Sequence, residues 1–97
     1  MLDKRKFYIN GEWVDPITPH DLEVINPATE KPIAVISMGT AADIDRAVTA
    51  AKTAFQRYSR TSLDERIALL EKLLEIYTRR YDEMARTITL ELGAPIT

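Results

Sequence analysis

Cysteine is absent from this 97-residue chain. Its absence excludes disulfides, thiolate zinc sites and thiol nucleophiles within these residues. Glycine is scarce as well, and the three glycines lie too far apart to form a loop that cradles a phosphate. No unbroken apolar run exceeds four residues, the length of residues 33–36, which is far short of a membrane span.

Neither sign of charge dominates the chain. Lysine and arginine together number 13, against 15 aspartates and glutamates, which gives a formal net charge of -2. This balance provides no electrostatic reason to expect nucleic acid or a membrane as a partner. Residues 1–6 carry the charge of a signal peptide, but no apolar core follows them, so we expect a cytoplasmic protein.

The remaining composition is that of an ordinary globular protein, with 45% hydrophobic and 29% charged residues. A chain of this length can form one domain with a modest core and bury about two-thirds of its unfolded surface. It is too short for two domains or for one of the large α/β enzyme folds.

Two short hairpins are predicted in residues 1–39. Asn10-Gly11 lies between two β-favouring runs and suits a tight turn, because both residues tolerate positive φ. A second hairpin is predicted from residues 22–25 and 33–38, and such small units need something to lie against. The basic residues 4–6 are interpreted as a solvated lead-in to the first strand.

Helices are predicted from Thr40 onward. Thr40 and Asp43 form a helix start, and the face that follows is small and rich in alanine. Ser62 and Glu65 form a capping box that opens a second helix. The apolar arc of this helix covers about half of the cylinder, so the helix is expected to have neighbours on two sides. It comprises Leu63, Ile67, Leu69, Leu70, Leu73, Leu74, Ile76 and Tyr77.

A third helix is predicted to end at Gly93, with Pro95 as the stop behind it. No glycine or proline separates it from the second helix. We expect a break between residues 79 and 82, with Asp82 as a candidate cap.

The residues that could carry chemistry are few. His20 is the only histidine and lies in a loop, where a solvated role is expected. Trp13 could stack on a ligand, although an aromatic residue in a short hairpin is more often part of a core. Glu71 and Glu75 lie on the polar face of a helix and are interpreted as surface charge. No catalytic centre is visible.

Five blocks of sequence resemble the NAD(P)-dependent aldehyde dehydrogenase superfamily, in family order and along the whole chain. They are FYINGEWV (7–14), VINPATEKPI (24–33), the helix start DIDRAV with AAK and AF (43–55), ER (65–66) and ELGAPI (91–96). The second block is similar to the family's V-I-N-P-A-T hairpin, and the last to the E-x-G-K-P close of its third helix.

The resemblance implies an α+β fragment of the α/β aldehyde dehydrogenase fold, with two short β-hairpins followed by three α-helices. It identifies residues 1–97 as a single N-terminal segment of the cofactor-binding domain, divided into hairpins (1–39) and helices (40–97). The catalytic and dinucleotide-binding parts are expected to be absent from the segment.

The resemblance further implies oxidation of an aldehyde through a covalent thiohemiacetal, hydride transfer to NAD or NADP, and thioester hydrolysis. The family's nucleophilic cysteine, general-base glutamate and oxyanion asparagine have no counterpart in these 97 residues. We therefore expect the chain alone to be inactive and to bind no dinucleotide.

One site can be carried over from the family. Several members hold a monovalent cation between backbone carbonyls just before the Asn-Pro turn and an acidic residue at the end of the third helix. The corresponding positions are Val24, Ile25 and Glu91. Carbonyl and carboxylate oxygens suit Na⁺ or K⁺. The alternative is that Glu91 is a surface residue and Ile25 an ordinary strand residue.

The expected partner is the remainder of an aldehyde dehydrogenase chain, because in the family this region wraps the cofactor-binding domain. Without it, the apolar helix faces are expected to be exposed and to drive self-association or exchange of elements between copies. Two alternatives stay open: a stand-alone noncatalytic module that binds partners or assembles, and a degraded reading frame that lost its catalytic part.

Overall fold

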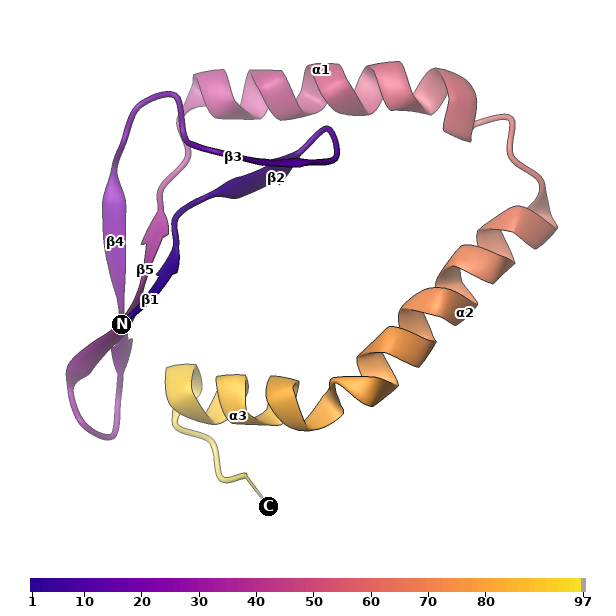
Figure 1. Cartoon of the computed structure of the whole chain (residues 1–97). Helices are drawn as coiled ribbons and strands as arrows, with labels where there is room; N and C mark the ends of the chain where they lie inside the picture. Colours follow the sequence, from indigo (N-terminus) through magenta and orange to yellow (C-terminus); the bar gives the residue numbers. More distant parts are fainter. Residues whose placement is uncertain (97) are drawn as a thin grey trace.

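The computed structural model describes residues 1–96. Its strands are β1 (Leu2–Lys4), β2 (Phe7–Ile9), β3 (Glu12–Val14), β4 (Asp21–Asn26) and β5 (Lys31–Ser37). Its helices are α1 (Ala41–Tyr58), α2 (Leu63–Arg79) and α3 (Tyr81–Leu92). Figure 1 shows the three helices following one another around the rim of an open frame, which β4, β5 and β1 close on the remaining side.

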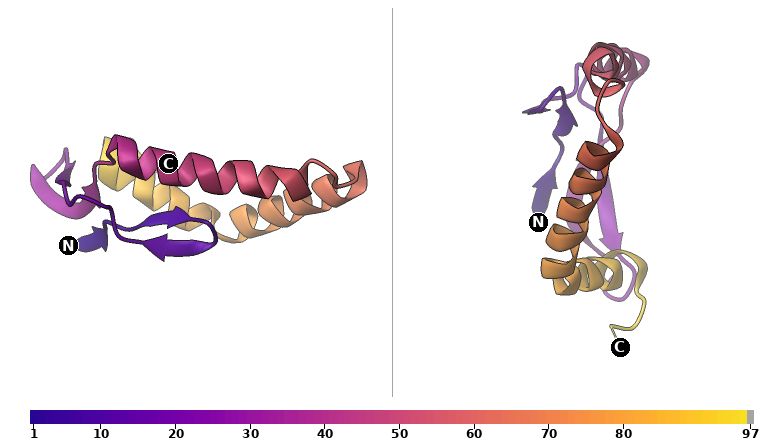
Figure 2. Two further views of the ribbon diagram at one scale, coloured as in Figure 1. Left: turned by 90° about the horizontal axis from the view of Figure 1, so that it is seen from above. Right: turned by 90° about the vertical axis from the view of Figure 1, so that its right-hand side faces the viewer.

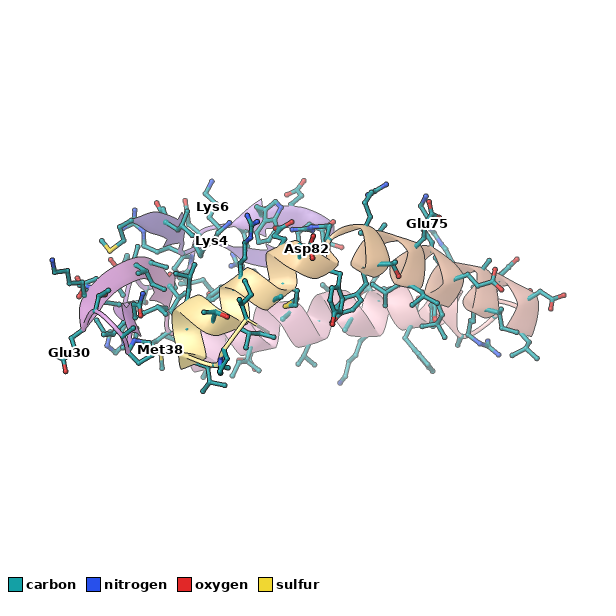
Figure 3. All side chains as sticks on the ribbon, turned by 90° about the horizontal axis from the view of Figure 1, so that it is seen from below. Lys4, Lys6, Glu30, Met38, Glu75 and Asp82 are labelled. Carbon is teal, nitrogen blue, oxygen red and sulfur yellow. The ribbon has the colours of Figure 1, made fainter. Side chains whose placement is uncertain are left out.

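The predicted hairpins are both present. In the first, Tyr8 pairs with Trp13, and the turn residues Asn10 and Gly11 have φ values of 55° and 77°. β4 and β5 form the second, whose turn is closed by a 2.7 Å hydrogen bond from the Glu30 N–H to the Asn26 carbonyl. Glu30 points away from the rest of the chain at the tip of this turn (Figure 3).

β1, which is the third strand of the sheet that contains β4 and β5, was not predicted. It pairs in parallel with β5, with Leu2 opposite Ala34, and the sheet order is β1-β5-β4. The interpretation of residues 4–6 as a solvated lead-in is therefore wrong for Lys4, which belongs to β1, although its side chain is exposed. The free edge of β5 offers these residues hydrogen-bond partners that local sequence does not reveal.

The helix boundaries follow the predicted caps. The Ser62 hydroxyl accepts a hydrogen bond from the Glu65 N–H at 3.1 Å, and the Glu65 carboxylate accepts one from the Ser62 N–H at 3.2 Å. The expected break separates α2 from α3 at Arg80. Asp82 does not cap α3: the N-cap is Arg80, whose guanidinium forms an ion pair with Glu83 at 2.6 Å.

The molecule is flat and open. It measures 49 × 37 × 16 Å, and Figure 2 shows its elements in one thin layer when seen edge-on. The radius of gyration is 17.2 Å, whereas a compact chain of this length would have one of about 13 Å. The exposed surface is 8292 Å², against about 5600 Å² for a compact monomer of this mass.

This shape leaves almost no core. Among the described residues, Ala34 is the only hydrophobic residue that is buried, at 8% exposure. The expectation of a modest core within this length is therefore wrong, because the elements are arranged in series and few of them face another. The predicted apolar faces of the helices are largely exposed, with Phe55 at 65% and Leu70 at 66%. Within residues 1–96, no helix combines the length and the apolar character that crossing a bilayer requires.

Candidate functional site

Two of the residues predicted to hold a cation lie in β4, which packs against α3. The β4–β5 ladder is irregular there: Val24 pairs with Ala34, whereas Ile25 pairs with Pro32. Such an irregularity disrupts the ladder locally. The strand register therefore changes at the two residues predicted to supply main-chain oxygens.

The third predicted residue, Glu91, lies exposed in the last turn of α3. α3 ends at Gly93, whose φ of 81° is in the left-handed region. A Cβ at Gly93 would lie 3.0 Å from the Cγ of Pro27. The structure thus places the end of α3 against the Asn-Pro turn that follows β4. Within residues 1–96, no three His, Cys, Asp or Glu side chains gather as a metal site, so this set depends on main-chain oxygens and one carboxylate.

The other candidate residues form no reactive centre. The His20 side chain is exposed, and its carbonyl accepts a 2.7 Å hydrogen bond from the Met38 N–H. Trp13 is not part of a core: it is 67% exposed, with its ring centroid 5.1 Å from that of Tyr8. A surface hollow of about 430 Å³ beside it is lined by Asp3, Lys4, Lys6 and Trp13. This lining contains no cysteine, serine, threonine or histidine.

The most strongly constrained polar group is Asp43, in the first turn of α1. It is 4% exposed and is the only buried charged residue among those described. Its carboxylate accepts hydrogen bonds from the Ile17 N–H at 3.0 Å and from the Thr40 N–H and hydroxyl at 3.1 and 3.2 Å. The Arg46 guanidinium lies 3.6 Å from the same carboxylate.

These donors lower the pKa of the Asp43 carboxyl below its ordinary value of 3.8. The Ile17 N–H contributes most, followed by the Thr40 N–H, while burial opposes them by raising the pKa. Hydrogen bonds that are made to the charged form of a carboxylate favour that form. Asp43 is therefore ionised at neutral pH.

Sequence reasoning found Asp43 only in part. The Thr40–Asp43 spacing indicated the helix start and the local hydrogen bonds. The contact with Ile17 has no local signal, because the two residues are separated by 26 positions and meet only once the chain has turned back after β3.

The family model described as "Aldehyde dehydrogenase family" matches residues 13–97. A 3-succinoylsemialdehyde-pyridine dehydrogenase from a Pseudomonas species is 50% identical over 96 residues, which is 99% of this chain and 20% of that protein. The chain thus spans about a fifth of the length of this relative.

Solved structures show the same relationship. An aldehyde dehydrogenase from Bartonella henselae has 59% identity and a TM-score of 0.97, over 99% of this chain and 20% of its own. A mutant of aldehyde dehydrogenase C from Pseudomonas syringae, in complex with NAD+ and octanal, has 44% identity and a TM-score of 0.93, over 95% of this chain and 19% of its own. The sequence blocks, the order of the elements and these matches agree, and the chain belongs to the aldehyde dehydrogenase family as an N-terminal portion of its fold.

Proposed function

We propose that these 97 residues are part of an NAD-dependent aldehyde dehydrogenase that oxidises an aldehyde to a carboxylic acid. The observation that carries this proposal is the match in both sequence and fold along the described chain, with 59% identity and a TM-score of 0.97 to a solved member. The chain covers 20% of that member. The activity is therefore proposed for a longer polypeptide that contains these residues.

NAD is the cofactor we propose, with NADP as the alternative. The P. syringae relative holds NAD+ together with octanal, and an aldehyde dehydrogenase from Mycobacterium tuberculosis also holds NAD+. When bound, the nicotinamide accepts the hydride that leaves the aldehyde carbon. The present residues would hold none of the reacting groups, since a cysteine nucleophile cannot come from a chain that has no cysteine.

The role proposed for residues 1–97 is that of one segment of the cofactor-binding domain, with hairpins in 1–39 and helices in 40–97. Its partner would be the remainder of the same polypeptide, which would cover the apolar helix faces. These faces are exposed in the segment alone, and surface of this kind marks an interaction site. We also propose a cytoplasmic location. The net charge of -2 gives no reason to expect nucleic acid or a membrane as a partner.

A monovalent cation, Na⁺ or K⁺, is proposed at Val24, Ile25 and Glu91. The local fit rests on the irregular ladder at Val24 and Ile25 and on the position of α3 against the turn that follows β4. The test compares Glu91→Ala with Glu71→Ala, a carboxylate removed from the exposed face of α2. K⁺ should raise the melting temperature of the unmodified protein and of Glu71→Ala, but not that of Glu91→Ala. A melting temperature that K⁺ and Na⁺ leave unchanged in all three proteins would contradict the site.

The activity is tested by following NADH formation from an aldehyde. The isolated 97-residue chain should form none, whereas a longer polypeptide that continues into a cysteine-bearing catalytic region should form it. If the isolated chain formed NADH, the proposal that the reacting groups lie outside these 97 residues would be wrong. A reading frame with no catalytic region after Thr97 would favour a stand-alone binding or assembly module.

A further inference from the structure

The connection between β3 and β4 is held by few hydrogen bonds, one of them from the Met38 N–H to the His20 carbonyl at 2.7 Å. It covers residues 15–20 and contains Pro16 and Pro19, neither of which has an N–H to donate. Two hydrogen bonds join it to α1: the Ile17 N–H donates to the Asp43 carboxylate at 3.0 Å, and the Arg46 guanidinium donates to the Asp15 carbonyl at 3.1 Å.

These two contacts form one unit, because Arg46 also lies 3.6 Å from Asp43. Asp43 is 4% exposed. Hydrogen bonds to a charged acceptor are stronger than neutral ones, and a buried carboxylate that lost its donors would be costly. Arg46 is the only charged side chain that the structure pairs with Asp43 among the described residues. The buried carboxylate is therefore satisfied by Ile17, Thr40 and Arg46 together, and losing the Ile17 N–H would leave one of its acceptor positions unpaired.

The β2–β3 hairpin leads directly into this connection. A two-stranded hairpin is marginally stable on its own, and β2–β3 lies along α1 rather than in the larger sheet (Figure 1). Phe7 at its base lies against Gly39, just ahead of α1. Its outer face carries the exposed pair Tyr8 and Trp13. The position of Tyr8 and Trp13 therefore depends on how firmly the hairpin is held to α1.

We propose that Asp43 and Arg46 act as a clamp that fastens the β3–β4 connection to the first turn of α1 and thereby holds the β2–β3 hairpin along that helix. Opening of the clamp frees the hairpin and the connection while β4 and β5 stay paired, since the β4–β5 ladder makes its own hydrogen bonds. The clamp is local to residues 7–46 and does not depend on the proposed enzymatic activity.

The test is residue-resolved amide hydrogen exchange on the 97-residue chain, comparing the unmodified protein with Asp43→Asn. The matched control is Asp45→Asn, which removes an exposed carboxylate two residues along the same helix. In Asp43→Asn, exchange of the Ile17 amide should rise by about tenfold or more, because its acceptor becomes an uncharged amide. The β2–β3 amides should follow, and the β4–β5 amides should keep their protection. Asp45→Asn should leave all of them unchanged.

Three outcomes would overturn the clamp. The first is an Ile17 amide that exchanges at the unfolded-chain rate in the unmodified protein. The second is equal protection of this amide in Asp43→Asn and in the unmodified protein. If Asp43→Asn also unfolds β4–β5, Arg46→Gln provides the third test, because it keeps the Asp43 carboxylate with its hydrogen bonds from Ile17 and Thr40 while removing the guanidinium from Asp43 and from the Asp15 carbonyl. Arg46→Gln should loosen the connection while the ladder stays protected, and unchanged exchange in the connection would contradict the proposal.

Discussion

Gly93 shows how one residue can meet two demands at once. Its φ of 81° lies where residues with a Cβ are strained, and a Cβ there would approach Pro27 Cγ to 3.0 Å. The αL cap and the contact between α3 and the turn that follows β4 therefore both depend on the missing side chain. The cap itself was predictable from the Gly-x-Pro ending, whereas the contact with Pro27 was not.

Gly93→Ala should destabilise the protein by about 1–2 kcal/mol, the usual cost of a left-handed conformation for a residue with a Cβ. Gly39→Ala is the matched control, since a Cβ at Gly39 would meet its nearest neighbour, the Phe7 ring, at an ordinary 3.7 Å. Thermal unfolding of the three proteins, followed by circular dichroism, measures the difference. Equal losses of stability in Gly93→Ala and Gly39→Ala would show that the end of α3 is less constrained than its geometry indicates.

The Asp43 carboxyl gives a pH dependence whose sign follows from its hydrogen bonds. Its pKa is lowered in the folded chain, first by the Ile17 N–H, so its stabilising contribution is present above the unfolded value of 3.8. That contribution is lost as the pH falls through the lower, folded pKa. In NMR spectra, the Ile17 and Thr40 amide protons should shift together, with a common midpoint below 3.8. A midpoint at or above that value, or separate midpoints, would contradict the shared carboxylate.

At the scale of elements, local chemistry accounts for most boundaries. Asn10 and Gly11 have the positive φ values that the tight hairpin needs, and Ser62 forms the capping box that opens α2. β1 was missed because three residues with exposed side chains carry no alternating pattern, and their strand exists only through the free edge of β5. The break between residues 79 and 82 was predictable, but Asp82 lies in the first turn of α3 and not at its cap, because the helix already begins at Tyr81 after Arg80.

The α2 cap can be tested apart from the rest of the chain. Ser62→Ala removes the hydroxyl that accepts from the Glu65 N–H, and it should cost about 1 kcal/mol and some helical signal. Ser59→Ala is the control, because Ser59 lies at the other end of the same inter-helix loop and serves as the C-cap of α1 through its backbone. Chemical unfolding of both variants gives the comparison. A loss in Ser59→Ala as large as that in Ser62→Ala would argue against a specific cap.

For the candidate cation site, the sequence supplied the residues only through family resemblance. No spacing within the chain links Val24 and Ile25 to Glu91, which is 66 positions beyond Ile25. The structure adds that β4 and α3 pack together and that the ladder is irregular at Val24 and Ile25. Such meetings depend on tertiary packing, which local propensity does not encode.

At the scale of the whole molecule, the three helices present apolar faces that the other described elements leave largely exposed. α2 is the clearest case: its apolar arc was predicted to need neighbours on two sides, and its leucines at positions 69, 70, 73 and 74 are all more than half exposed. Burial of a leucine side chain contributes about 1.5–3 kcal/mol. A protein with so many such side chains in water gains substantially from any partner that covers them. The relatives' five-fold greater length makes the rest of the same polypeptide the partner that we propose.

The central claim, that these residues form one layer over a larger body, is tested most directly by sedimentation of the isolated 97-residue chain in the presence of a hydrophobic dye. We predict dye binding together with self-association that increases with concentration, since the exposed helix faces have no other way to leave water. A compact monomer that binds no dye at any concentration would contradict the account.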